Sequence, residues 1–228
     1  GLHSAEIFVP ECAHAVVSAS ISCSSERKPL VVVAPTNTEA EKLFNDLKVF
    51  IGFEKVEFFP SWETLPFERI SPGVETMGKR LRVLHRLVTS EETLEVIVTS
   101  ARALVQKLSV QEETFPIFLK TGDLIDQREL LAKLVAFGYK REYQVEHRGE
   151  VAIRGSIVDI WPSTSDSPVR VDLWGDEIER VCEFGVADQR TKHSLDEVEI
   201  FPCRELILKS EMLEKATSMV DQPHRPTA

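Results

Sequence analysis

The sequence predicts an α/β domain with a parallel sheet, followed by a smaller α+β domain with an antiparallel sheet. Between residues 30 and 107, short apolar runs alternate with helical patterns, which is the order of a parallel α/β sheet. Beyond about residue 117 the hydrophobic period falls to two and turn residues separate the runs, as in antiparallel strands. We therefore expect domains at 1–117 and 118–204, and a further segment at 205–228.

The first expected strand is LVVVA at 30–34, a β-branched apolar run that ends at a proline. Thr36 or Thr38 can cap the helix that follows, and Gly52 can end it. A second strand is expected at 56–59.

A long helix is expected over 74–88, a third strand over 95–100 and a short helix from Ala101 to about Lys107. Helical spacing predicts that the inner stripe of the long helix holds Met77, Leu81, Leu84 and Leu87 or Val88.

The second domain begins with FPIFLKTGD and a helix at about 126–137, which Gly138 closes. The segments VAIRGSIVDIWP, SPVRVDLWGDEIERVCEFG and EVEIFP then alternate as strands, and Gly175-Asp176 indicates a hairpin turn. The last segment, 205–228, holds one helical pattern and a polar tail that we expect to be disordered.

Composition indicates a soluble protein of the reduced cytoplasm. No run of 18 apolar residues could span a membrane, the start of the chain lacks a signal-peptide pattern, and the four cysteines form no C-x-x-C pair. The formal net charge is −10. Because nonspecific DNA binding depends on lysine and arginine, this balance excludes a chain-wide DNA-binding surface.

Motifs for catalysis are missing from the sequence. A phosphate loop needs G-x-x-x-x-G-K-[ST], but Gly78-Lys79 is followed by arginine and lies in the expected helix at 74–88. DEVE at 196–199 superficially matches an acidic motor motif, but we interpret it as the start of a strand. No metal-ligand spacing of histidines and no G-x-S-x-G motif occurs, so we expect no catalytic residue, metal or cofactor.

Three basic residues share one face of the helix at 74–88. Lys79, Arg82 and Arg86 follow i, i+3 and i+7 spacing. They form either a weak contact with the DNA backbone or an ordinary solvated helix face.

A second candidate site lies in the expected antiparallel sheet. In VRVDLW, alternation sends the apolar residues to one face and leaves Arg170, Asp172 and Trp174 on the other. Arg154 points outward in EVAIRG by the same rule. Since arginine and tryptophan are enriched at binding hot spots, Arg154, Arg170 and Trp174 are a candidate protein-binding patch. The alternative is two surface arginines and a tryptophan covered by a neighbouring loop.

Several of these segments together carry a family resemblance. They are FPSWETLPFERISP, the R-L-x-x-L helix, RGEVAIRGSIVDIWP and PVRVDLWGDEIERVCEFGVADQRT, in this order. Over roughly residues 28–204 the chain resembles the N-terminal, UvrB-like module of the bacterial transcription-repair coupling factors (Mfd). The resemblance implies a motor-like α/β domain without a phosphate loop, and an inserted α+β domain that binds UvrA.

The resemblance assigns UvrA binding to positions Arg154, Arg170 and Trp174, the last of which is often phenylalanine in the family. It implies a monomeric, non-enzymatic adaptor fragment without a cofactor. RNA polymerase, DNA and ATP would bind other parts of a longer protein. The alternative is a UvrB-type nucleotide-dependent DNA-damage-binding protein, but the phosphate-loop lysine and the Tyr-rich hairpin of UvrB are absent. FFPSWETLPFERISP, at 58–72, is expected to be a structural corner and not a base-stacking platform.

Overall fold

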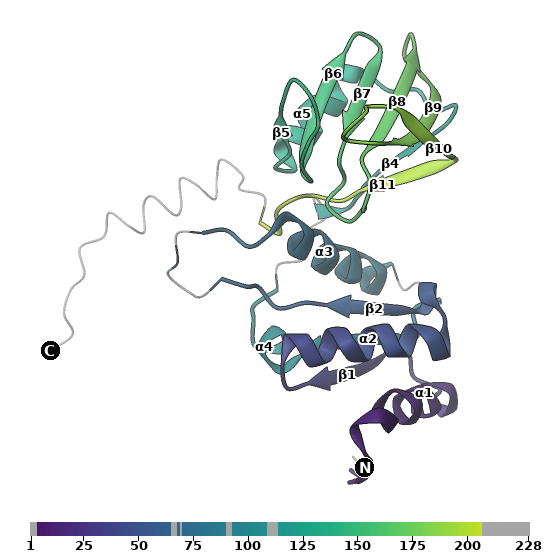
Figure 1. The fold of residues 1–228 in the computed structure, drawn as a ribbon, viewed down its shortest axis with the longest axis vertical. Coiled ribbons are helices and arrows are strands. Elements are labelled where there is room, and N and C mark those ends of the chain that lie inside the picture. Colours follow the sequence, from purple (N-terminus) through teal and green to yellow (C-terminus); the bar gives the residue numbers. More distant parts are fainter. Residues whose placement is uncertain (1–3, 65–67, 69, 90–92, 109–113, 207–228) are drawn as a thin grey trace, which may run out of the picture.

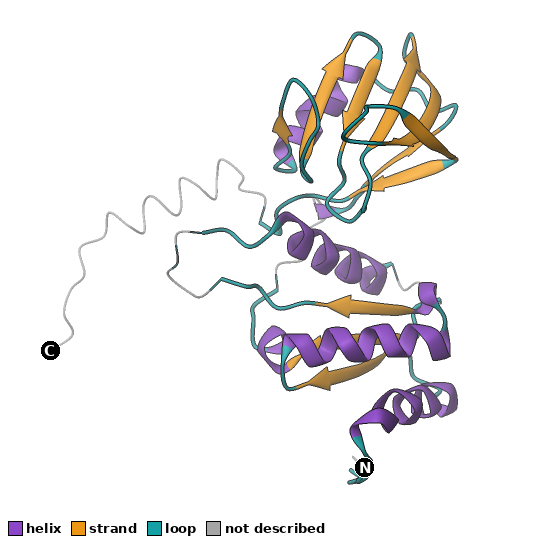
Figure 2. Ribbon diagram, in the orientation of Figure 1, coloured by secondary structure: helices purple, strands orange, loops and turns teal. Residues whose placement is uncertain are grey.

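Two main sheets form the structure, and helix α3 (Val74–Val88) lies between them (Figure 1). One sheet is parallel and carries helices on both faces, and the other is mainly antiparallel (Figure 2). The protein is therefore mixed α/β, as expected from the sequence. The computed structural model describes residues 4–64, 68, 70–89, 93–108 and 114–206.

The parallel sheet contains the three expected strands, β1 (Leu30–Ala34), β2 (Val56–Phe59) and β3 (Val96–Ser100). Their order is β1-β3-β2, so β3 is central and is buried along its whole length. Continuous burial explains the apolar run of β3, whereas β1, at the edge of the sheet, exposes Val31 and Val33.

Helices α1 (His14–Ser24) and α2 (Asn37–Ile51) cover one face of this sheet. As expected, the Thr36 side chain caps α2 by accepting the Glu39 N–H, and Gly52 ends the helix at a φ of 121°. Helix α1 was not predicted. The remaining helical turns before residue 114 are η1 (Glu11–Ala13), η2 (Phe53–Lys55) and α4 (Ala101–Leu104).

Helix α3 covers the other face of the parallel sheet, and its buried stripe differs from the prediction. Leu81 and Leu84 are buried as expected, but the side chains of Leu87 and Val88 are 41% and 51% exposed. Arg80 is instead fully buried. The physical reason is that Arg80 lies over the Phe59 ring and finds polar partners in Pro60 and Glu205, which satisfy its charge away from water.

The second main sheet has the order β10-β9-β8-β7-β6-β5, and every pairing except β5–β6 is antiparallel. The expected hairpin at Gly175-Asp176 is confirmed, since Trp174 pairs with Glu177 across it. The strands are β5 (Lys140–Arg141), β6 (Glu150–Arg154), β7 (Ile157–Ile160), β8 (Val169–Trp174), β9 (Glu177–Phe184) and β10 (Thr191–Leu195).

Helix α5 (Gln127–Ala136) and a two-stranded ribbon cover the inner face of this sheet. The ribbon pairs β4 (Ile117–Lys120) with β11 (Glu197–Ile200), which confirms that the DEVE motif belongs to a strand. Strands β4, β5 and β10 were not predicted, because β5 has two residues and β10 is largely polar. The division of the chain into domains near residue 117 stays a prediction.

A buried ion pair joins α3 to the segment that follows β11. Arg80 donates from Nε to the carboxylate of Glu205, and from Nη1 to the carbonyl oxygen of Pro60 at 2.8 Å. Trp62 donates its indole N–H to the same carboxylate at 3.1 Å. Its ring centroid lies 5.2 Å from the Arg80 guanidinium carbon.

The first residues of the segment 58–72 are buried, whereas Glu63, Glu68 and Ile70 are exposed, so the structural corner stays a prediction. Phe58 and Phe59 are buried in two different clusters, one on each face of the parallel sheet. Pro66 and Phe67 lie outside the described residues, as do the helical pattern and the tail expected at 207–228.

We predict that Glu205→Ala lowers the free energy of unfolding by about 3–5 kcal/mol, because it leaves the guanidinium of Arg80 buried without its counter-charge. Urea denaturation followed by circular dichroism measures the change. Glu129→Ala is the control, since it removes an exposed ion pair with Lys133 and should leave the transition in place. Equal transitions for the Glu205 variant and the parent would contradict the role of this pair.

We also predict that two of the four cysteines react with a thiol reagent in the folded protein. Cys12 and Cys23 are exposed, whereas Cys182 and Cys203 are buried. Burial raises the pKa of the Cys203 thiol to about 12, so it stays protonated and unreactive at pH 8. A colorimetric thiol assay should count about two fast thiols in buffer and four in denaturant. Rapid reaction that persists in a Cys12→Ser/Cys23→Ser variant would refute this.

Candidate protein-interaction site

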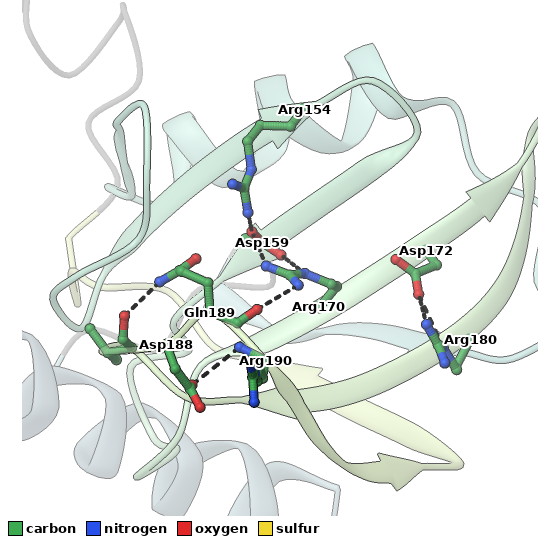
Figure 3. A network of polar contacts seen from close by, with 9 residues as sticks. Arg154, Asp159, Arg170, Asp172, Arg180, Asp188, Gln189 and Arg190 are labelled. Atoms are coloured by element: carbon green, nitrogen blue, oxygen red, sulfur yellow. Dashed lines mark hydrogen bonds and ion pairs between the residues drawn. The ribbon is translucent and has the colours of Figure 1, made fainter.

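The outer face of the antiparallel sheet is organised around Asp159, which is fully buried at the centre of β7. Its Oδ1 accepts a hydrogen bond from Arg170 Nε at 2.7 Å. Its Oδ2 accepts from Arg170 Nη2 at 2.9 Å and from Arg154 Nη2 at 2.6 Å (Figure 3). One carboxylate therefore fixes two guanidinium groups from the strands on either side, and the cluster keeps one net positive charge.

Strand pairing explains why these groups meet. Asp159 lies directly opposite Arg170 on β8 and opposite Ala152 on β6. Directly opposed residues in an antiparallel pair present their side chains to the same face. Arg154 lies two residues beyond Ala152 on the same strand, so it also reaches this face.

Arg170 is more enclosed than the sequence indicated. Its side chain is 12% exposed, and its Nη1 donates to the backbone oxygen of Gln189 at 3.0 Å. The guanidinium carbon lies 4.7 Å from the centre of the Phe184 ring. The hydrogen bonds to Asp159 raise the pKa of the Arg170 guanidinium, which therefore stays charged.

Arg154 and Trp174 are the more accessible members of the expected patch. The side chain of Arg154 is 37% exposed, and Trp174 is 78% exposed at the end of β8. Trp174 lies four residues from Arg170, which is about 13 Å along an extended strand. The structure thus brings the two arginines together and places the indole at the far end of the same face. The sequence analysis expected all three side chains to be exposed, and this is wrong for Arg170.

Burial along β8 confirms the predicted alternation. Val169, Val171 and Leu173 are buried, whereas Trp174 is exposed. A small apolar cluster covers the other half of the outer face and encloses Arg170 from one side. Its members are Val145, Ala152, Phe184 and Trp161.

Asp159 was missed by the sequence analysis. Its sequence signal is an acidic residue between apolar neighbours in SIVDIW, on a strand between two arginine-bearing strands. A lone carboxylate in such a strand is costly to bury unless cationic groups pair with it. That argument could have identified Asp159 as the partner of Arg154 and Arg170.

The basic residues of α3 do not all lie on a solvated face, which corrects that interpretation of the helix. Arg86 is buried and donates from Nη1 to Glu57 at 2.8 Å. Arg82 pairs with the same carboxylate, and Lys79 pairs with Glu75 at 2.6 Å. β2 places Glu57 beneath the helix, where Arg82 and Arg86 pair with it, and a contact of these residues with DNA stays a prediction.

The described residues contain neither a candidate metal site nor a candidate membrane span. Within them, no group of three or more histidine, cysteine, aspartate or glutamate side chains could hold a metal ion. No helix in this part of the chain is long and apolar enough to cross a membrane.

Comparison with known proteins defines the class of this surface. Residues 117–206, which include the Asp159 cluster and Trp174, match the UvrB interaction domain family. The family is named for an interaction and not for a catalytic activity.

The chain as a whole is related to the transcription-repair coupling factors, which confirms the resemblance seen in the sequence. The protein of this name from Mycobacterium tuberculosis is 39% identical over 224 residues, covering 93% of this chain and 18% of the relative. That of Bacillus subtilis is 30% identical and covers 90% and 17%, and that of Myxococcus xanthus is 32% identical and covers 88% and 18%. The chain spans less than a fifth of the length of these relatives.

We predict that Arg170→Ala destabilises the protein more than Arg154→Ala does. Removing Arg170 takes two hydrogen bonds from a buried carboxylate, which costs about 2–4 kcal/mol. Removing Arg154 leaves Asp159 held by Arg170 and costs about 1 kcal/mol or less. Urea denaturation of both variants measures the difference. Equal losses would show that Asp159 does not depend on Arg170 in the way the contacts indicate.

Proposed function

We propose that this chain is a non-enzymatic adaptor that recruits UvrA to a transcription-coupled DNA repair factor. The observation that carries the proposal is the Asp159 cluster, which presents a fixed, half-exposed Arg154 on the same sheet face as the exposed Trp174. The match to the UvrB interaction domain family and the relation to transcription-repair coupling factors support it.

The geometry favours binding because Arg154 is already oriented. Asp159 fixes one edge of its guanidinium, so less side-chain entropy is lost when a partner binds the rest. Arginine suits carboxylate and carbonyl acceptors, and the partner surface should therefore be acidic or rich in such oxygens near Arg154. Arg170 then acts mainly by holding Asp159 in place and by making the cluster net positive. Trp174 supplies apolar contact area.

The parallel-sheet part serves in this proposal as a motor-like scaffold without nucleotide. The sequence has no phosphate-loop lysine that could support ATP binding, so the chain needs no cofactor. It acts as a monomer in the cytoplasm, and RNA polymerase and DNA bind other parts of a longer protein.

The alternative, a UvrB-type nucleotide-dependent protein that binds damaged DNA, gains nothing from the structure. Arg82 and Arg86, which would contact DNA, pair with Glu57. No observation in the described part of the chain favours this function over the adaptor.

Calorimetric titration into purified UvrA from the source organism tests the proposal. Arg154→Ala and Trp174→Ala should each lower the affinity about 30-fold or more, as hot-spot residues worth about 2 kcal/mol do. Both are more informative than Arg170→Ala, whose effect on binding would be mixed with its effect on folding.

The matched control is Lys133→Ala, which removes an exposed cation from α5, on the opposite side of the sheet. It should bind like the parent. Binding of all variants with equal affinity would show that UvrA uses another surface. A folded parent that does not bind UvrA would reject the adaptor function for this chain.

A further inference from the structure

The end of the β8–β9 hairpin differs in charge from the arginine cluster. Trp174 pairs across the hairpin with Glu177, and a register shift follows between Asp172 and Leu173. Arg180 pairs with Asp172 and Ile178 with Leu173, so Glu179 is the extra residue of a β-bulge. The bulge leaves Glu179 and Arg180 both exposed while Ile178 and Val181 are buried on the inner face.

Trp174, Glu177 and Glu179 together line a shallow hollow at this end of the sheet. Within the described residues, neither Glu177 nor Glu179 forms an ion pair or a side-chain hydrogen bond. The nearest arginine on the strand, Arg180, is held by Asp172 through a bond of 2.5 Å (Figure 3). The hollow thus combines an open indole face with two carboxylates that form no ion pair within the described residues.

We propose that this hollow binds a lysine or arginine side chain of the partner protein. This inference rests on the proposed adaptor function, which it extends by naming the chemistry that the partner presents at Trp174. A cation over the face of tryptophan is attracted by the ring quadrupole, and this attraction is strongest for tryptophan among the aromatic residues. The two carboxylates add opposite charge beside the ring, and both terms select a cation over a neutral or anionic group.

The same features exclude a nucleic acid as the occupant. An exposed tryptophan alone could stack on a base. Here the flanking carboxylates of Glu177 and Glu179 would repel the phosphates that accompany every base, since nucleic-acid binding depends on phosphate neutralisation. A basic protein side chain meets no such repulsion.

The whole face then has a polarity that fixes the orientation of the partner. The Asp159 cluster carries one net positive charge from two guanidinium groups and one carboxylate. The hollow carries two negative charges, and the neutral Asp172–Arg180 pair lies between them in the sheet. A partner must therefore present an acidic group to Arg154 on β6 and a basic group to Trp174 at the end of β8, two strands away across the sheet. Docking in the reversed direction would place like charges together.

The first test does not depend on UvrA. The chain has three tryptophans, and a Trp174→Phe variant identifies the indole N–H signal of Trp174 in a nitrogen-15 NMR spectrum. Titration with N-acetyl-arginine amide should shift this signal at millimolar concentrations and leave those of Trp62 and Trp161 in place. N-acetyl-citrulline amide, which has the same shape without the charge, is the control probe.

The proposal expects the arginine probe to bind at least about threefold more tightly than the citrulline probe, which reflects the cation–π contribution at an exposed site. A Glu177→Gln/Glu179→Gln variant should lower this preference, because it removes the carboxylates and keeps the Trp174 ring. Equal shifts with both probes, or no shift of the Trp174 signal, would overturn the assignment of a cation-binding hollow.

The second test measures affinity for UvrA. Glu177→Gln/Glu179→Gln should weaken binding about three- to tenfold, and Glu177→Lys/Glu179→Lys should weaken it further. Glu129→Gln on α5 is the matched control. If Arg154→Ala reduces binding and the glutamate variants do not, the adaptor function stands and this inference is wrong. If the parent does not bind UvrA at all, the adaptor function fails, and the probe titration decides whether the hollow selects a cation.

Discussion

Pairing of buried charges is the constraint on which this structure depends. Removing an ion from water costs several kcal/mol, which only a close opposite charge and further hydrogen bonds can offset. Arg80 meets this condition through Glu205, and Asp159 meets it through Arg154 and Arg170. The first pair joins α3 to the segment after β11, and the second fixes the side chains of the candidate site. The same physical requirement therefore sets both the architecture and the interaction surface.

The two clusters differ in how much of each cation remains accessible. Arg80 is fully buried beneath aromatic rings, so its charge contributes to the structure alone. Arg170 is largely enclosed, and Arg154 keeps one side of its guanidinium open to solvent. Arg170, the inner arginine, holds Asp159 in place. Asp159 in turn orients Arg154, the outer arginine. A guanidinium fixed in this way can bind a partner with little loss of conformational entropy.

A rigid sheet also explains how a small surface can be selective. The Asp159 cluster, the Asp172–Arg180 pair and the hollow beside Trp174 follow one another across neighbouring strands, and strand spacing sets their separation. A partner with the complementary order of charges fits in one direction only. The β-bulge at Glu179 contributes because it keeps two successive charged side chains on the exposed face.

The sequence by itself determined the elements whose signals are local. The strands at 30–34, 56–59 and 96–100, the Thr36 cap and the hairpin at Gly175-Asp176 follow from periodicity and turn chemistry, and the structure confirms them. Alternation along β8 correctly separated the buried valines from Arg170 and Trp174.

Only the tertiary structure decided which polar residues are buried and which partners they meet. Helical spacing placed Arg86 on a solvated face, but packing of α3 on the parallel sheet buried it against Glu57 of β2. Asp159 could not be joined to Arg154 and Arg170 from the sequence alone, because strand register depends on the whole sheet. Local patterns determine the secondary structure, whereas the pairing of buried charges depends on contacts between residues far apart in the chain.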